Sequence, residues 1–414
     1  MPLALTIAIT HLLTRKRQTA VSMLGVAMGV GFAIAMAAMM QGFQQYFVSK
    51  IVDVTPHIVM KDEFRNPPVQ PAAMRFSHGA LAIRGVRPRE ELRGIRRARR
   101  ILSVLSKRQN LAVAPSLQGQ VFLRYGSKDV GANLVGIDPD RQRHVSNLES
   151  DLIGGSLDHL KTSANGLIIG YGLAGKLGVK MRDTVTAVSP EGVILKMKIV
   201  GIFRTGLINL DDGESYALLK KVQILQKRIN VVNQLHMRLK NPDAARGVAA
   251  SIERRYRYRT ESWQEANEGV LGVFVIQHAI MYATTGAILI VACFGIFNII
   301  STVIFEKTRD IAILKSMGFE EGDIRTIFLL EGMAVGVAGS LLGWSLGFGL
   351  IQLLASIKFD VEGIVKLQGF VLYTSWVHYA IATSAAILSA GFAAYLPARK
   401  AARLRPVDII RGAA

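Results

Sequence analysis

Charged residues and cysteine are both scarce in this sequence. Only 19% of the 414 residues are charged and half are hydrophobic, which argues against a water-soluble globule of this size. The single cysteine, Cys293, lies in an apolar stretch, so an internal disulfide and a cysteine metal site are excluded. The sequence has no HExxH, no GxSxG and no carboxylate pair placed for acid–base work. We therefore expect a membrane protein that is not an enzyme and binds no metal.

Long apolar runs define the expected membrane spans. A helix needs about 20 apolar residues to cross a bilayer, and four stretches meet this test, at about 21–43, 276–305, 327–354 and 371–396. The expected fold class is a four-helix transmembrane bundle with a large mixed α/β extracytoplasmic domain between the first and second spans. The expected segments are an amphipathic N-terminal helix (1–18), span 1 (19–46), the extracytoplasmic domain (47–275), span 2 (276–305), a loop (306–326), span 3 (327–355), a short outer loop (356–370), span 4 (371–397) and a tail (398–414).

Basic residues beside the spans predict the orientation. They are Arg15, Lys16 and Arg17 before the first span, Lys307, Arg309, Lys315 and Arg325 between the second and third, and Arg399, Lys400, Arg403, Arg405 and Arg411 after the fourth. The short outer loop instead balances Lys358 and Lys366 with Asp360 and Glu362. Because short cytoplasmic loops are rich in Lys and Arg, both termini and the 306–326 loop are expected in the cytoplasm. No cleavage pattern follows the first span, which indicates an uncleaved anchor.

The extracytoplasmic domain is expected to mix strands and helices. Alternating or β-branched runs predict strands at 121–125, 131–136, 167–169, 184–189, 193–200 and 233–239. Helical patterns fall near 89–105, 217–227 and 243–254. The run from Ser189 to Gly192 predicts a tight hairpin turn. About 225 residues suffice for one or two compact lobes.

A basic run stands out between Arg84 and Arg108, where ten Lys or Arg residues face only Glu90 and Glu91. Nucleic acid is an improbable partner outside the cytoplasm, and no aromatic residues interleave the run. Two alternatives remain open: a solvated face that is merely basic, and contact with lipid phosphates or an acidic partner.

A glycine-rich motif follows one predicted strand. Residues 167–177 contain both GxGxxG and GxxxxGK, each of which could hold phosphates at a helix N-terminus. Leu177 replaces the hydroxyl that would hold magnesium in the second motif, and the βαβ context of the first is not evident. We expect a structural turn here.

Glycines in two spans indicate close helix packing. Gly25 and Gly29 form a GxxxG pair in the first span, and a longer ridge follows in the third. The ridge consists of Gly332, Gly336, Gly339, Gly343 and Gly347. Small residues let helix backbones approach closely in a membrane.

The stretch from Phe305 to Phe319 joins the second and third spans. Its charges gather at the front, Ile311, Leu314 and Met317 recur at helical spacing, and Gly318 stands where a left-handed residue would close a helix. The pattern predicts a short amphipathic helix on the membrane face. Such a helix either anchors the loop among lipid headgroups or docks on a cytoplasmic partner.

Several motifs resemble a known family. They are Phe297-Asn298-Ile299-Ile300-Ser301, Glu306-Lys307, Asp310-Ile311-Ala312-Ile313-Leu314-Lys315, Met317-Gly318, Gly136-Ile137-Asp138-Pro139, Gly166-Leu167-Ile168-Ile169-Gly170, Gly201-Ile202-Phe203 with Asp211, and Pro397–Ala402 followed by Leu404, Pro406 and Val407. Together they cover nearly the whole chain. They resemble the FtsX-like permeases of MacB-type ATP-binding-cassette (ABC) systems and are most similar to the lipoprotein-releasing Lol permeases.

The resemblance implies a partner and a mechanism. The 306–318 segment would be the coupling helix that docks on a dimer of a separate cytoplasmic ATPase, which would carry ATP and magnesium. Its expected coupling residues are Glu306, Lys307, Arg309, Asp310, Ile311, Ala312, Ile313, Leu314, Lys315, Met317 and Gly318. Two permeases, identical or different, would pair in the inner membrane and act by mechanotransmission, in which ATP-driven movement of the spans moves the extracytoplasmic domains.

The expected cargo is a lipoprotein or another amphiphile taken from the outer leaflet. Its entry cleft is expected where Phe43 and Phe47 of the first span meet Phe274 and Ile276 of the second. The alternative function is an ABC-coupled regulator of a periplasmic hydrolase or signalling partner. One departure from the Lol pattern is the short Ser189–Gly192 turn, where carrier-recruiting permeases have a long hairpin. Direct docking of a periplasmic carrier is therefore not expected of this chain.

Overall fold

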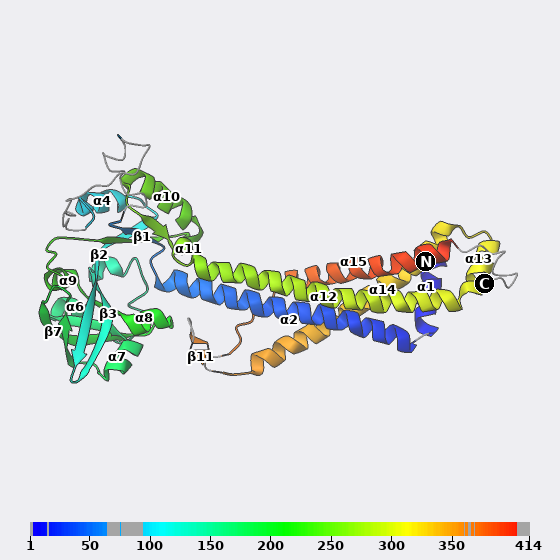
Figure 1. The fold of residues 1–414 in the computed structure, drawn as a ribbon, viewed down its shortest axis with the longest axis horizontal. Helices are drawn as coiled ribbons and strands as arrows, with labels where there is room; N and C mark the ends of the chain where they lie inside the picture. The colour runs from blue at the N-terminus through cyan, green and yellow to red at the C-terminus, as the bar shows by residue number, and fades with distance from the viewer. Residues whose placement is uncertain are drawn as a thin grey trace. The chain divides into compact units, whose positions relative to one another are not determined.

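The computed structural model describes residues 3–14, 16–63, 75, 94–359, 361–362, 366–367 and 369–403. The chain divides into two compact units (Figure 1). We call residues 1–46, 272–359 and 368–414 the helical unit, and residues 47–271 and 360–367 the sheet unit. Several residues of the basic segments, outer loop and family motifs lie outside the described residues. They are Arg15, Arg84, Arg87, Arg89, Glu90, Glu91, Arg93, Asp360, Leu404, Arg405, Pro406, Val407 and Arg411.

The helical unit consists of long helices and two short ones. Its elements are α1 (Leu3–Thr14), α2 (Lys16–Val54, which continues into the sheet unit), α12 (Glu268–Glu306), α13 (Thr308–Ser316), α14 (Glu321–Ser356) and α15 (Trp376–Ala402). Within the described residues, α2, α12, α14 and α15 are long and apolar enough to cross a membrane. The expected fourth span was placed too early, because residues 371–375 are not helical. A Ser375 side chain that accepts a hydrogen bond from Val377 N–H caps α15 instead.

The glycine ridge of α14 lies against two other helices. A side chain at Gly332 or Gly336 would meet the Cβ atoms of α15 alanines at 2.4 and 2.9 Å. At Gly339 and Gly343 it would meet Cβ atoms of α2 valines at 2.7 Å, and at Gly347 that of an α2 isoleucine at 3.1 Å. The ridge thus places α14 between α15 and α2, at distances that only glycine permits.

The GxxxG pair of the first span behaves differently from the ridge. Gly29 lies against Ile288 of α12, at 3.3 Å from an added Cβ, whereas a Cβ added at Gly25 would meet none of the described residues within 4 Å. The expected contact at Gly25 is not found, because the α2 surface that meets α14 carries Val26, Val30 and other residues off the Gly25 row. A spacing of four residues therefore identified only one of the two contact positions.

Substitution of Gly343 should separate α2 from α14. A leucine there must displace Val30, whose Cβ would lie 2.7 Å from the new Cβ, and overpacking of this kind costs about 1–3 kcal/mol or more. We expect Gly343→Leu to lower the thermal midpoint of the purified permease by several degrees. Gly25→Leu is the matched control, since it meets open space. Equal midpoints for the two variants would contradict the ridge.

The sheet unit is built on one mixed sheet. Its strands are β1 (Ile58–Lys61), β2 (Leu111–Tyr125), β3 (Lys128–Ile137), β4 (Leu152–Gly155), β5 (Gly166–Gly170), β6 (Thr184–Val188), β7 (Ile194–Phe203), β8 (Glu214–Leu218), β9 (Gln234–Leu239) and β10 (Thr260–Ser262). They follow the order β10-β1-β9-β2-β3-β8-β5-β7-β4, and β6 pairs with both β2 and β7. The pairs β3–β8 and β5–β7 are parallel and the others antiparallel. A separate small hairpin pairs β11 (Val361–Glu362) with β12 (Lys366–Leu367).

Because β6 bridges β2 and β7, six strands close into a ring around a hydrophobic core. Leu123, Leu134, Val185 and Ile199 in this core are fully buried, and the alternating burial of β6 and β7 follows the two-residue period of a strand. The helices of the unit are α4 (Ala98–Leu105), α5 (Pro139–Gln142), α6 (His159–Thr162), α7 (Tyr171–Leu177), α8 (Ile208–Gly213), α9 (Leu219–Leu225), η1 (Pro242–Ala244), α10 (Ala245–Tyr256) and α11 (Trp263–Ala266). The six strands predicted from the sequence are all present, as β2, β3, β5, β6, β7 and β9.

Burial lowers the pKa of His236 from the usual 6.5 to about 4. His236 is protonated near pH 6.5 in the unfolded chain but only near pH 4 in the folded chain. The neutral buried histidine therefore makes its full contribution to the free energy of unfolding above pH 6.5, and this contribution is lost as the pH falls toward 4. The loss amounts to at most about 3 kcal/mol. We expect the thermal midpoint of His236→Gln, whose amide can still donate to Gln234, to fall less than that of the native chain between pH 7 and 4.5. His144→Gln, at an exposed histidine, should change nothing, and parallel decline of all three proteins would contradict the assignment.

Candidate functional site

The coupling segment, residues 306–318, is seated on the helical core. Helix α12 ends at Glu306, and α13 follows after a single bent residue, Lys307. Ile311 and Ala312 are 3% and 1% exposed, and Ile311 belongs to the same apolar cluster as buried residues of α12, α14 and α15. The helix therefore rests on protein and does not need lipid to cover this face.

The end of α13 is closed by a defined hydrogen-bond pattern. Gly318 has φ of +101°, which strongly favours glycine. Phe319 N–H donates to Leu314 O at 3.2 Å and Gly318 N–H donates to Lys315 O at 3.2 Å, which is the Schellman arrangement. Leu314 and Phe319 both pack on the apolar cluster. The glycine thus turns the chain sharply into α14, as the sequence predicted.

Two charged contacts fix the orientation of α13. The Lys307 ammonium lies 2.6 Å from the Asp310 carboxylate, three residues on. Lys315 Nζ donates to the carbonyl of Ala402 at 2.7 Å, in the last turn of α15. A cation at a helix C-terminus satisfies a free carbonyl and interacts favourably with the helix dipole. The Lys315 contact joins α13 to the end of α15.

The outer face of the coupling segment carries exposed apolar side chains. Ile313 is 55% exposed, Met317 72% and Phe305 87%, and Arg309 and Glu306 are also exposed. The sequence predicts Met317 at helical spacing with Ile311 and Leu314. The structure places Met317 outward with Ile313, because residues four apart lie on the same side of a helix. Exposed apolar groups that recur at intervals of four residues are typical of a protein or membrane contact.

A cavity of about 560 Å³ lies within the helical unit between α2, α12 and α15. Much of its lining is apolar and includes Val30, Ala37, Met281 and Leu289. Binding sites for small apolar molecules typically measure about 300–1,000 Å³. The volume and the walls suit an acyl chain or another apolar group of similar size.

Polar side chains gather along part of the same cavity. They are Gln41, Gln44, His278, Tyr282, Thr285, Tyr373, Ser375 and His378. A ring nitrogen of His278 donates to Phe274 O at 2.6 Å, and Gln41 Oε1 accepts a hydrogen bond from His378. Polar groups in apolar helices are costly and usually functional. Together with the apolar walls they make the cavity amphiphilic.

The segment 371–375 forms a strap across α2. Tyr373 N–H donates to Ala38 O at 2.9 Å. A Cβ at Gly42 would lie 2.2 Å from Val371 O and 2.8 Å from Tyr373 N, so the strap reaches α2 only because residue 42 is glycine. Since Tyr373 and Ser375 line the cavity, Gly42 helps to set its shape.

The residues expected to form the cleft are not among those that line this cavity. Phe43 and Phe274 stack edge to face at 5.9 Å between ring centroids, and Phe274 is 4% exposed. Ile276 is 62% exposed, and Phe47, further along α2, is buried. The cavity residues, missed from the sequence, begin one turn further into α12 at His278. Their signal was the presence of glutamine and histidine in otherwise apolar spans.

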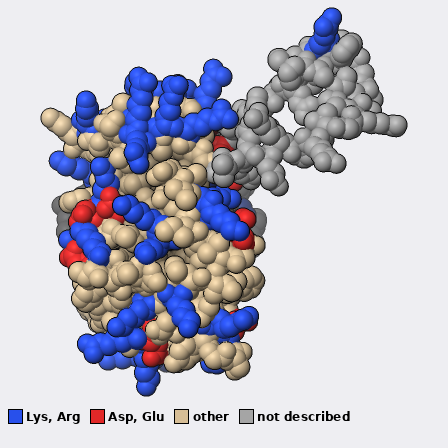
Figure 2. Space-filling view, turned by 90° about the vertical axis from the view of Figure 1, so that its left-hand side faces the viewer, with Lys and Arg blue, Asp and Glu red and all other residues tan. Residues whose placement is uncertain are grey.

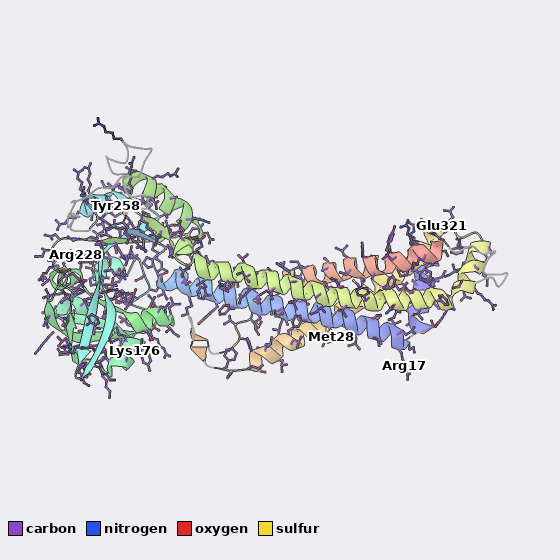
Figure 3. All side chains as sticks on the ribbon, in the orientation of Figure 1. Arg17, Met28, Lys176, Arg228, Tyr258 and Glu321 are labelled. Carbon is purple, nitrogen blue, oxygen red and sulfur yellow. The ribbon has the colours of Figure 1, made fainter. Side chains whose placement is uncertain are left out.

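The glycine-rich motif of the sheet unit has no room for a phosphate. An added Cβ at Gly170 would lie 2.2 Å from Asp211 O, and one at Gly172 would lie 1.7 Å from a carboxylate oxygen of Asp212. Lys176, labelled in Figure 3, pairs with Asp212 at 2.9 Å. Helix α8 therefore fills the space in which a ligand would bind, which explains the glycines structurally. Among the described residues, no three His, Cys, Asp or Glu side chains gather as metal ligands would.

The described part of the basic run is only partly helical. The predicted helix 89–105 is found as α4, from Ala98, with Ile101 and Leu105 buried. Arg99, Arg100 and Lys107 are exposed. Figure 2 shows this side of the sheet unit, on which Lys and Arg side chains are far more frequent than Asp and Glu. The two alternatives for this run, a solvated face and an anionic partner, remain predictions.

Comparison with known proteins identifies the family. The MacB-like periplasmic core domain family matches residues 19–255, more than half of the chain, and the FtsX-like permease C-terminal family matches residues 282–406. The lipoprotein-releasing system transmembrane protein LolC of Xylella fastidiosa is 25% identical over 99% of both chains. The uncharacterized ABC transporter permease YknZ of Bacillus subtilis is 24% identical over 98% of this chain and 97% of its own. The macrolide export ATP-binding/permease protein MacB of Hyphomonas neptunium is 23% identical over 94% of this chain and 58% of its own. This chain therefore belongs to the ABC transporter permeases of the FtsX and MacB type, membrane proteins in which apolar helices carry a MacB-like periplasmic core domain.

Proposed function

We propose that this permease extracts a lipoprotein or another amphiphile from the outer leaflet of the bacterial inner membrane. The observation that carries the proposal is the amphiphilic cavity between α2, α12 and α15. Its apolar walls suit acyl chains and its polar side chains suit an ester, amide or headgroup. The full-length similarity to proteins named for lipoprotein release supports the same cargo class.

The proposed topology has four spans with both termini in the cytoplasm. In support, basic segments meet at one end of the helical unit. Lys315 of α13 bonds to the last turn of α15, beside Arg399 and Lys400, and Figure 3 labels Arg17 and Glu321 at this same end. Lys and Arg are enriched in cytoplasmic loops. We refer to this as the α13 end and propose that it faces the cytoplasm.

The energy source in this proposal is ATP hydrolysis by a separate ATPase dimer that docks on the coupling segment and carries ATP and magnesium. The exposed Ile313 and Met317 supply an apolar contact, while buried Ile311 attaches that contact rigidly to the spans. A displacement imposed on α13 is then passed to α12 and α14, between which it lies. Anchoring in lipid is the competing role for the same face.

A second permease subunit, identical or different, completes the proposed assembly. Helix α12 is the least covered span: 17% of its apolar window is buried, against 44% for α2. Exposed α12 side chains such as Val291 and Phe294, 71% and 66% exposed, would contact lipid, cargo or the partner permease.

Photocrosslinking in cells that contain the partner ATPase tests the cargo. A photoreactive amino acid at Leu289, which lines the cavity, should crosslink to acylated protein. The same amino acid at Ile290, the next residue and 58% exposed, should give lipid or permease adducts instead. A crosslinked hydrolase or kinase without acylated protein, or equal acylated adducts at the two positions, would contradict extraction.

A further inference from the structure

The apolar helix α14 carries a buried carboxyl group, that of Glu331. Glu331 lies in the third turn of α14 and is 3% exposed. Buried Phe328 and Val335, one turn away on either side, belong to the apolar cluster. Its Oε2 atom accepts no hydrogen bond from the residues that the structure describes. Such a group is strongly unfavourable in a membrane unless a partner compensates it.

The partner comes from the N-terminal helix. His11 Nδ1 of α1 lies 3.8 Å from Glu331 Oε2, and the His11 ring lies 6.3 Å from the ring of Phe328. The two side chains are 20% and 4% exposed, and Nδ1 of His11 has no hydrogen-bond partner in the described part of the chain. Within the part of the chain that the structure describes, His11 is the only ion-pair partner found for Glu331. The two groups form an ion pair when His11 is protonated.

The remaining contacts of α1 are mostly apolar and not directional. Ala8 is 1% exposed, and Ile7 and Leu12 pack on the apolar cluster of the long helices. Thr19 Oγ1 donates to Leu12 O at 3.1 Å, which fixes the corner between α1 and α2. Apolar contacts tolerate sliding, whereas one buried polar contact can fix the register of two helices.

The coupling segment leads directly into α14 and packs on its first turns. Ile324, Ile327 and Phe328 in its first turns share the apolar cluster with Ile311 of α13. We propose that the contact of His11 with Glu331 holds α1 in register on α14, so that α1, α13 and the start of α14 move as one body when the ATPase acts. His11 and Glu331 are positioning residues in this account, which rests on the proposed function.

Replacing the carboxyl group separates positioning from stability. Glu331→Leu removes a buried charge and supplies apolar volume, so its thermal midpoint should equal or exceed that of the native permease. We expect it to retain ATP hydrolysis in the reconstituted permease–ATPase complex, while cargo released per ATP falls about tenfold, within the usual range of coupling between sites. A Glu331→Leu complex with the native release per ATP would overturn the proposal.

Exchanging the two side chains between positions 11 and 331 provides a control, because a merely structural role of either residue would not predict recovery. His11→Glu combined with Glu331→His restores the pair in reverse and should recover most of the coupling lost in either single variant. No recovery, in a double variant that retains the native thermal midpoint, would contradict the pair.

Crosslinking tests the same contact without any transport assay. In a Cys293→Ser background, cysteines at positions 11 and 331 should be joined by a short bis-maleimide, and the joined permease should still hydrolyse ATP and release cargo with its ATPase. Absence of the crosslink, or a joined permease whose ATP hydrolysis stops, would overturn the proposal. If the crosslink forms and the complex hydrolyses ATP while the native complex releases no acylated protein, the proposed cargo is wrong and the positioning contact stands.

Discussion

Ile313→Asp combined with Met317→Asp is expected to weaken ATPase binding by about 1,000-fold, since two buried apolar anchors at an interface contribute about 2 kcal/mol each and every 1.4 kcal/mol is tenfold in affinity. Both side chains point outward, at 55% and 72% exposure, so the substitutions leave the seat of α13 on Ile311 intact. The measurement is the affinity of the detergent-solubilised permease for its purified ATPase.

The control for this variant uses exposed isoleucines elsewhere. Ile224 and Ile229 of the sheet unit are 51% and 73% exposed, and their replacement by aspartate should leave ATPase binding unchanged. If the α13 variant binds the ATPase with native affinity, the docking role is wrong and lipid anchoring is left as the role of the outer face of α13.

Gly42→Val is expected to push the strap away from α2 and so to distort the cavity. Any Cβ at this position meets the backbone of the strap at 2.2 Å from Val371 O, and backbone cannot rotate away as a side chain can. The strap must lift, the hydrogen bond from Tyr373 N–H to Ala38 O is lost, and overpacking of this size costs about 1–3 kcal/mol. We expect cargo crosslinking at Leu289 to fall about tenfold or more while ATPase binding at the other end of the unit is retained.

Gly25→Val is the matched control on the same helix. Gly25 has nothing within 4 Å, so its valine should affect neither cargo nor ATPase. Unchanged crosslinking in the Gly42 variant would show that the strap does not shape the cargo site.

The long helices could be predicted because their signal is local. A run of about 20 apolar residues needs no knowledge of its neighbours, and the four runs correspond to α2, α12, α14 and α15. The boundaries failed where structure depends on a distant contact. Val371 and Leu372 are as apolar as the helix that follows, yet they form the strap, because Gly42 offers a seat on α2.

In the sheet unit, too, elements with a local signal were predicted and elements that depend on distant contacts were not. Strands with clear alternation, such as β6 and β7, were predicted, whereas β1, β4, β8 and β10 were missed. The missed strands have three to five residues, and each acquires its conformation from pairing with chain segments far away in the sequence. Short strands carry too little periodicity to be recognised alone.

The coupling segment was predicted more completely from the sequence than the cavity, also because its signal is local. The coupling segment is contiguous, so its helix, its closing glycine and its buried Ile311 followed from spacing. The cavity is assembled from three helices that meet only in the fold, and the predicted aromatic residues are not among those that line it. Gln41, His278 and His378 were visible as polar residues in apolar runs and would have indicated it.

The distance across the cavity tests the central claim most directly. Spin labels at Ala37 of α2 and Thr285 of α12, both cavity residues, can be measured by pulsed electron paramagnetic resonance in the Cys293→Ser permease bound to its ATPase. ATP with vanadate should shorten this distance in the native complex and leave it unchanged in the Ile313→Asp, Met317→Asp variant. The same distance with and without nucleotide in the native complex, or an equal shift in the variant, would contradict transmission through α13.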